Sequence, residues 1–181
     1  DHGWPGWRLF ALILAAMIGA RTCAMAFNRI VDRKFDALNP RTAGRHLPAG
    51  KISLASAVTL CALSAVGFIA AAWFINPLCF YLSPVALAVL CFYSLTKRFT
   101  DFTHVYLGIA LALAPVGGWL AVRGTAVTPL EMVQMSVLAL AVVFWLIGFD
   151  IIYAMQDYEF DRRHGLRSLV VAWGPRNALQ A

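Results

Sequence analysis

The sequence has few charged residues and lacks several motifs that soluble enzymes commonly carry. Charged residues make up 13% of the 181 residues, and Asp and Glu together number only 9. The four cysteines show no Cys-x-x-Cys spacing, so they indicate neither a disulfide framework nor a zinc site. The chain contains no Gly-x-x-x-x-Gly-Lys-Ser/Thr motif, which argues against a nucleotide cradle of that type.

What remains is a strongly apolar chain. Hydrophobic residues make up 61% of it, and the mean hydropathy is +0.71, well above that of an ordinary globular domain. Five apolar runs of 18 to 24 residues are long enough to cross a hydrocarbon core of about 30 Å as helices. These candidate spans are residues 9–27, 52–74, 78–95, 105–122 and 132–155. We predict an integral membrane protein in a lipid bilayer, an all-α polytopic transmembrane helix bundle with five helices and no strands.

The basic residues are distributed unevenly along the chain, which has a net charge of +6. Of the 15 Lys and Arg residues, 12 follow the first, third or fifth span: Arg29, Arg33, Lys34, Arg41, Arg45, Lys51, Lys97, Arg98, Arg162, Arg163, Arg167 and Arg176. Successive spans cross in opposite directions, so these segments share one side, and the positive-inside rule predicts that this side is cytoplasmic. Because this asymmetry is a topology signal, we expect no nucleic-acid partner.

A polar stretch at residues 28–36, the first motif, follows directly on the first span. At about 100° per helical residue, its Asn28, Asp32 and Asp36 fall within an arc of roughly 80°. One helix face therefore carries an amide and two carboxylates. Acidic residues contribute little to membrane orientation, so this clustering favours a functional role over a topology anchor.

A second polar stretch, residues 150–161, ends the fifth span and is the second motif. Asp150, Asp157 and Asp161 are spaced i, i+7 and i+11, which places them within about 40° of one another on an ideal helix. Both motifs lie on the predicted cytoplasmic side, and we expect their polar faces to oppose each other across one cavity. Two carboxylate faces of this kind predict a divalent-metal site.

Basic residues accompany both motifs on that side. Tyr93, Lys97 and Arg98 end the third span, and Arg41 and Arg45 lie in the loop after the first motif. Mg²⁺ binds carboxylates, keeps several waters and bridges to phosphate oxygens, whereas Lys and Arg neutralise phosphate charge. Together these parts are expected to hold a diphosphate group.

Two ionisable residues lie deeper in their spans. Arg21 precedes the first motif by seven residues, and Asp150 precedes the next aspartate of the second motif by seven. A charge at that depth costs a few kcal/mol, so such residues usually face a cavity and have a partner. His2, His104 and His164 stand alone in the sequence, and we interpret them as solvated.

Four motifs in this order and spacing resemble the UbiA superfamily of intramembrane aromatic prenyltransferases. The motifs are Asn28-x-x-x-Asp32-x-x-x-Asp36, Arg41-Thr42-x-x-Arg45, Tyr93-x-x-x-Lys97-Arg98 and Asp150-x-x-Tyr153-Ala-x-x-Asp157-x-x-x-Asp161. Within that superfamily the chain resembles bacterial members known as 4-hydroxybenzoate polyprenyltransferases. The resemblance implies a bundle of about nine transmembrane helices around a lateral cavity open to lipid. On that basis residues 1–181 are interpreted as a single membrane domain, a fragment without the first span and the last three.

The resemblance also implies an activity. Members transfer a polyprenyl group from polyprenyl diphosphate to an aromatic acid acceptor such as 4-hydroxybenzoate, in ubiquinone or menaquinone biosynthesis at the bacterial inner membrane, with Mg²⁺ as cofactor. The metal ligands implied are Asn28, Asp32, Asp36, Asp157 and Asp161. Lys97 and Arg45 would neutralise the leaving diphosphate. Arg21 and Asp150 would orient the acceptor, and Arg21 would do so by pairing with the acceptor's carboxylate. Tyr93 and Tyr153 would line the site.

Other functional classes make weaker matches to the residues. A transporter or ion-pathway protein would also place acids near membrane helices, but its coupling site is expected near the bilayer midplane on broken, repeated helices. A CDP-alcohol phosphotransferase would use membrane aspartates and Mg²⁺, but the sequence lacks the Asp-Gly-x-x-Ala-Arg run that such enzymes carry. A purely structural membrane fragment accounts for the spans and leaves the two carboxylate faces unexplained.

Overall fold

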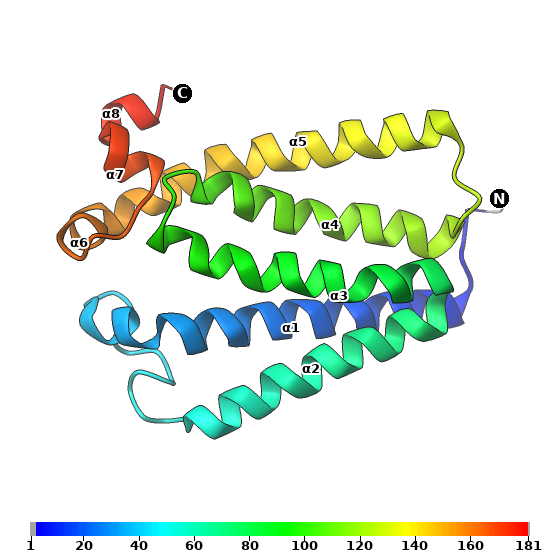
Figure 1. Ribbon diagram of the computed structural model, residues 1–181, viewed down its shortest axis with the longest axis horizontal. Helices are drawn as coiled ribbons and strands as arrows, with labels where there is room; N and C mark the ends of the chain where they lie inside the picture. The colour runs from blue at the N-terminus through cyan, green and yellow to red at the C-terminus, as the bar shows by residue number, and fades with distance from the viewer. Residues whose placement is uncertain (1–2, 181) are drawn as a thin grey trace. The chain divides into compact units, whose positions relative to one another are not determined.

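The described part of the chain is predominantly helical. The computed structural model describes residues 3–180, and within them no strand occurs. Five long helices dominate (Figure 1): α1 Trp7–Leu38, α2 Leu54–Ile75, α3 Pro77–Phe92, α4 Thr103–Arg123 and α5 Pro129–Ala154. The prediction of an all-α bundle with five long apolar helices is confirmed.

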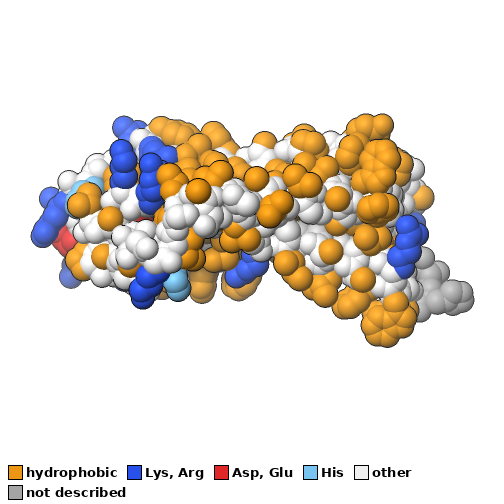
Figure 2. Space-filling view, turned by 90° about the horizontal axis from the view of Figure 1, so that it is seen from below, with side chains coloured by type: hydrophobic (Ala, Val, Ile, Leu, Met, Phe, Trp, Pro, Cys, Tyr) orange, Lys and Arg blue, Asp and Glu red, His pale blue; other side chains and the backbone are white. Residues whose placement is uncertain are grey.

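Five helical segments, each built on one of these helices, are long and apolar enough to cross a membrane. The third span continues from α3 through a 3₁₀ segment, η1 Tyr93–Arg98, and the fifth continues from α5 through η2 Met155–Asp157 and α6 Tyr158–Arg163. Hydrophobic side chains cover much of the face seen in Figure 2, and most of the Lys and Arg visible there lie towards its two ends. At most 22% of any span's most apolar window is buried within the chain, as expected of helices whose apolar faces contact lipid.

The observed elements differ from the predicted spans at their ends. α1 continues as helix to Leu38, so the first motif is an extension of the first span. Two further short helices, α7 Leu169–Trp173 and α8 Pro175–Ala178, follow α6 and were not predicted. Both are too short to give a periodic apolar pattern, and each begins at a local signal, Ser168 as an N-cap and Pro175 as a first helical residue.

The chain divides into two compact units. The first contains the chain up to Cys91 and Gly117–Thr128, and the second contains Phe92–Val116 and the chain from Pro129 onward. The first motif belongs to the first unit, and the second motif belongs to the second.

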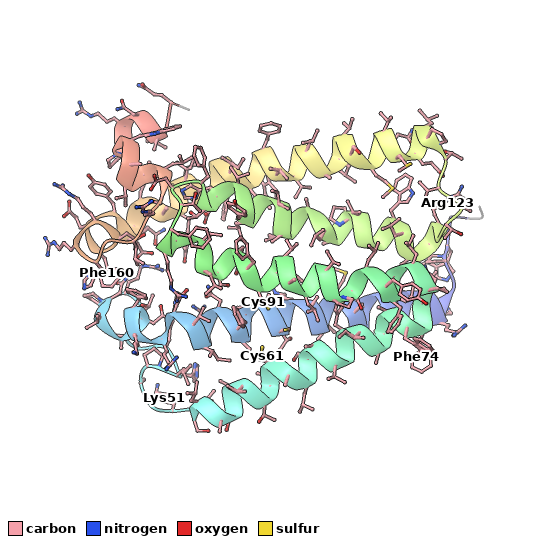
Figure 3. The ribbon with its side chains drawn as sticks, in the orientation of Figure 1. Lys51, Cys61, Phe74, Cys91, Arg123 and Phe160 are labelled. Atoms are coloured by element: carbon pink, nitrogen blue, oxygen red, sulfur yellow. The ribbon has the colours of Figure 1, made fainter. Side chains whose placement is uncertain are left out.

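In the first unit, α1 and α2 pack along each other. The contact is close because Gly19 has no side chain: a Cβ there would lie 3.1 Å from both the Phe68 nitrogen and the Ser64 carbonyl oxygen. One turn further along α1, Cys23 Sγ lies 3.7 Å from the Sγ of Cys61 on α2. Cys61 is labelled in Figure 3. All four cysteines are free thiols.

The junction of α2 and α3 is tied to the end of α4 within the same unit. Asn76 Oδ1 accepts a hydrogen bond from the Cys79 N–H at 2.8 Å, which caps the start of α3. Asn76 Nδ2 donates to the Leu120 carbonyl at 3.0 Å. One side chain therefore satisfies backbone groups of two helices where the chain reverses.

In the second unit, the segment after α6 folds back onto α5. Its core consists of five buried apolar residues from α5, α7 and α8: Ile151, Ala154, Leu169, Val170 and Ala178. Gly108 allows α4 to approach α5 closely, since a Cβ there would lie 3.0 Å from the Val143 carbonyl oxygen. This packing fixes the chain on both sides of the second motif.

The α1–α2 contact gives a test of the first unit. Gly19→Leu places a side chain against the backbone of α2, so it should lower the free energy of unfolding by about 1–3 kcal/mol. Gly67→Leu is the matched control, because a Cβ at Gly67 meets nothing within 4 Å. The measurement is the SDS-induced unfolding midpoint in mixed micelles, and equal midpoints for the two variants would contradict this packing.

Candidate active site

The first motif occupies the last turns of α1. Asn28 Nδ2 donates a hydrogen bond to Asp32 Oδ2 at 3.0 Å, one helical turn further on. The two side chains therefore share one face, as the spacing predicted. Asp32 is half-buried, whereas Asp36, one turn beyond, is only 7% exposed.

Asp36 lies between two guanidinium groups. Arg45 Nη1 is 2.6 Å from Asp36 Oδ1, and Arg29 Nη1 is 3.8 Å from Oδ2. Within residues 3–180, Asp36 Oδ2 is buried without a hydrogen-bond partner. A buried carboxylate oxygen without a donor is energetically costly, and an added ligand of positive charge would relieve that cost.

The turn after α1 brings Arg45 back onto the helix end. Helices usually end before a residue that precedes proline, and here α1 ends before Asn39 and Pro40. Asn39 Oδ1 accepts from the Arg41 N–H at 3.0 Å, and Thr42 Oγ1 donates to the Asp36 carbonyl at 3.0 Å. The second of these bonds satisfies one of the last carbonyls of the helix and folds the loop over it.

The second motif runs through three consecutive elements. α5 ends at Ala154, the 3₁₀ turn η2 follows, and α6 begins at Tyr158. The prediction of one unbroken helical arc from Asp150 to Asp161 is wrong, because a 3₁₀ turn has three residues per turn and changes the phase. Asp157 and Asp161 are nevertheless both buried, at 8% and 3% exposure.

Lys97 is the cation that the structure places beside the second motif. Its Nζ lies 3.4 Å from Asp161 Oδ2, and η1 supplies it from the end of the third span. The Lys97 side chain is 39% exposed, whereas that of Asp161 is 4% exposed. Asp161 is therefore covered by protein, while Lys97 reaches towards solvent.

A glycine turn and an arginine hold η1 against the segment after α6. Gly165 has φ +67°, and the Leu166 N–H donates to the Asp161 carbonyl at 2.9 Å, the bond that closes a Schellman motif. The chain then reaches Arg167, whose backbone N–H donates to the Lys97 carbonyl at 2.7 Å. Arg167 Nη1 also donates to the Phe99 carbonyl at 3.0 Å. These bonds determine where Lys97 stands relative to Asp161.

His104 is the residue that sequence reasoning placed wrongly. It is fully buried at the start of α4, and its Nδ1 lies 2.6 Å from Asp150 Oδ2. A lone histidine in the sequence gave no sign of this pairing, because Asp150 lies 46 residues away. His164 is exposed, as predicted, and His2 lies outside the described residues.

The remaining predicted site residues lie on more open surfaces. Arg21 is exposed on α1, two turns before the first motif. Tyr153 is 44% exposed on α5, and Tyr93 begins η1. Their roles stay predictions.

The donor chemistry of both motifs suits Mg²⁺. Within residues 3–180, no three His, Cys, Asp or Glu side chains converge closely enough to hold a metal by themselves. Mg²⁺ typically takes one or two protein carboxylates together with waters and substrate phosphates, so a complete protein cage is not expected. The carboxylates and amide of the motifs, with the unsatisfied Asp36 Oδ2, fit this kind of binding.

Comparison with known families assigns the chain. The model of the UbiA prenyltransferase family matches residues 1–181, so the chain belongs to this family. Curated relatives include 4-hydroxybenzoate octaprenyltransferases from Methylobacillus flagellatus, 37% identical over 173 residues, and from Burkholderia vietnamiensis, 37% identical over 175 residues. These matches cover 95% and 96% of this chain but 56% and 58% of the relatives. The chain thus spans little more than half the length of the curated relatives that it matches.

Solved structures share the fold. An apo UbiA homologue from Aeropyrum pernix aligns with a TM-score of 0.90 and 38% identity, over 97% of this chain and 65% of that one. A UbiA homologue from Archaeoglobus fulgidus, solved with DMAPP and Mg²⁺ bound, aligns with a TM-score of 0.74 and 26% identity, over 98% and 62% of the two chains. The five apolar helices and the family together identify an integral membrane protein.

The Asp36–Arg45 pair gives a test of the loop after α1. Arg45→Ala leaves a nearly buried carboxylate with one partner fewer, so it should lower the free energy of unfolding by about 1–3 kcal/mol. Adding Asp36→Asn to that variant should recover part of the loss, because it removes the buried charge. The control is Lys34→Ala, which removes an exposed cation from α1. The SDS-induced unfolding midpoint is measured for the wild type and the three variants. An Arg45→Ala variant as stable as Lys34→Ala would disprove the pairing.

Proposed function

We propose that the full-length protein transfers a polyprenyl group from polyprenyl diphosphate to an aromatic acid, with Mg²⁺ as cofactor. The observation that carries this proposal is a pair of buried carboxylates, Asp36 and Asp161, each in contact with a cation, in two motifs of oxygen ligands. Relatives named 4-hydroxybenzoate octaprenyltransferase, and homologues solved with DMAPP or GPP and Mg²⁺, support the reaction class.

The proposed metal ligands are the acids and the amide of the two motifs: Asn28, Asp32, Asp36, Asp157 and Asp161. When bound, Mg²⁺ would supply positive charge to the diphosphate oxygens, which makes diphosphate a better leaving group. Asp36 and Asp161 are the best prepared of the set, because protein already covers both and each lies beside a cation.

Lys97 and Arg45 would neutralise the charge that develops on the diphosphate as its C–O bond breaks. In the described chain Arg45 contacts a carboxylate of the first motif, and Lys97 contacts one of the second motif. We infer that each turns from that carboxylate to phosphate oxygens when the substrate is bound. The partly exposed Lys97 side chain is well suited to such a movement. Tyr93, at the start of η1, would line the same region.

The aromatic acceptor would lie deeper in the membrane than the diphosphate. Arg21 precedes Asn28 by two helical turns, about 10 Å along the axis, and its guanidinium suits an acceptor carboxylate. Asp150 also precedes the next acid of its motif, Asp157, by seven residues, so we place it at a depth similar to that of Arg21. There it would orient the ring, with Tyr153 nearby. An electron-rich ring held there would attack C1 of the allylic group as diphosphate leaves.

A site within the membrane suits this reaction for two reasons. The prenyl tail is itself apolar and partitions into lipid, and exclusion of water protects the allylic cation from hydrolysis. We propose that both motifs face the cytoplasm, since most basic residues follow the spans that end there, and that the protein resides in a bacterial inner membrane, as the relatives' sources suggest.

The metal assignment predicts which acids are essential. In the full-length protein, Asp32→Asn or Asp157→Asn should reduce prenyl transfer at least 100-fold, about 2.7 kcal/mol in transition-state free energy, because each removes a ligand charge. Glu159→Gln changes an exposed acid of the same segment, whose carboxylate lies 3.8 Å from Arg163, and should keep full activity. The assay is product formation in membranes with Mg²⁺. Near-normal rates in either Asp variant would refute the assignment.

The acceptor assignment makes a different prediction for Arg21. Arg21→Ala should lower kcat/KM for the aromatic acid by a factor corresponding to about 1.5–3 kcal/mol, the value of a charged hydrogen bond, and leave the donor KM unchanged. Arg8→Ala, which removes an exposed cation from the other end of α1, is the control. Loss of donor affinity with acceptor affinity intact would move Arg21 into the diphosphate site.

A further inference from the structure

In the second unit, a buried histidine outside the four motifs is paired with an aspartate of the second motif. His104 Nδ1 lies 2.6 Å from Asp150 Oδ2, the length of a strong charge-assisted hydrogen bond. His104 belongs to α4 and Asp150 to α5, so the contact joins two helices of the same unit.

The direction of the bond follows from taking Asp150 as a carboxylate. A carboxylate only accepts hydrogen bonds, so the donor is His104 Nδ1–H and the acceptor is Asp150 Oδ2. The other ring nitrogen, His104 Nε2, is buried and has no hydrogen-bond partner within residues 3–180. The imidazole is therefore committed to Asp150 and to no other described group.

The exposure of the two side chains shows which one can meet a ligand. The His104 side chain is completely buried, whereas that of Asp150 is 21% exposed. The bond to His104 occupies Oδ2 alone and leaves Oδ1 without a described partner. A ligand that reaches this part of α5 therefore meets the aspartate and not the histidine.

We propose that His104 is a positioning residue, which holds Asp150 so that Oδ1 accepts a hydrogen bond from the hydroxyl group of the aromatic acceptor. This inference rests on the proposed prenyl transfer and names the ligand group that Asp150 binds. A carboxylate repels the acid group of the acceptor but accepts readily from a phenolic hydroxyl. Hydrogen bonding of that hydroxyl to an anion increases electron density on the ring, which favours attack on the allylic cation.

The orientation of Asp150 would otherwise be poorly fixed. An aspartate side chain has two rotatable bonds, and its terminal torsion is broad. The bond from His104, whose own ring is enclosed by protein, restricts both torsions. A reacting ring must be held in a narrow range of positions, so the loss of this restraint should affect the acceptor and leave the donor unaffected.

The test uses the full-length enzyme with 4-hydroxybenzoate as acceptor, and compares His104→Leu, Asp150→Asn and the double variant. His104→Leu and Asp150→Asn should each lower kcat/KM for the acceptor by about 10- to 100-fold, with the donor KM unchanged. Because His104 acts through Asp150, the double variant should be no worse than Asp150→Asn alone. Multiplied losses, or a change in donor KM, would overturn the proposal.

Two conservative replacements keep the test decisive if the leucine variant misfolds. The Asn amide nitrogen lies near the position of Nδ1, whereas that of Gln lies near Nε2, so His104→Asn should retain most activity and His104→Gln should not. Inhibition by benzoate, which lacks the hydroxyl, should be equal in wild type and Asp150→Asn. Equal activity of the Asn and Gln variants, or weaker benzoate inhibition of Asp150→Asn, would overturn the proposal.

The outcomes separate this inference from the proposed function. A wild-type enzyme that prenylates no phenolic acid would refute the proposed function and this inference with it. A wild-type enzyme that is active, with His104→Leu folded and equally active, would refute the role of His104 alone. Melting temperature in detergent, measured on the same samples, shows whether each variant is folded.

Discussion

An ionised side chain in an apolar helix bundle needs a counter-charge or a hydrogen-bond donor, and this requirement organises the polar groups of both units. Asp36 is paired with Arg45, Asp161 with Lys97 and Asp150 with His104. Such pairing offsets part of the free-energy cost of enclosing a charge in protein. The same acids therefore remain able to bind a metal ion or accept a hydrogen bond, which links the stability of the bundle to its proposed chemistry.

The partners of the acids come from short connecting segments, and backbone hydrogen bonds place those segments. Thr42 folds the loop after α1 over the helix end and so brings Arg45 to Asp36. Gly165 turns the chain after α6. Arg167 then donates hydrogen bonds to the carbonyls of Lys97 and Phe99, at the end of η1. Loops that carry binding residues on a rigid scaffold are common, and here the scaffold is the set of long helices. Changes in these turns would alter the charges around the acids without touching the acids themselves.

The sequence predicted the features that arise from local patterns. The five helices follow from apolar length, and the shared face of Asn28 and Asp32 follows from helical periodicity. The turn η2 was missed because no periodic signal marks three residues of 3₁₀ helix. The pairing of His104 with Asp150 was missed because it depends on how α4 packs against α5, and Gly108, which permits that approach, has no pattern of its own. Contacts across long sequence separations arise from packing and are not encoded in any single segment.

The central proposal is that the acids of both motifs bind Mg²⁺ and the diphosphate of the substrate in the full-length protein. A structure of the full-length protein with Mg²⁺ and a non-hydrolysable prenyl thiolodiphosphate would test it most directly. The account predicts metal-linked diphosphate in contact with carboxylates of both motifs, Asp32 or Asp36 from one and Asp157 or Asp161 from the other, with Lys97 turned towards a phosphate oxygen. Diphosphate bound to only one motif, or acids of either motif directed at lipid, would contradict it.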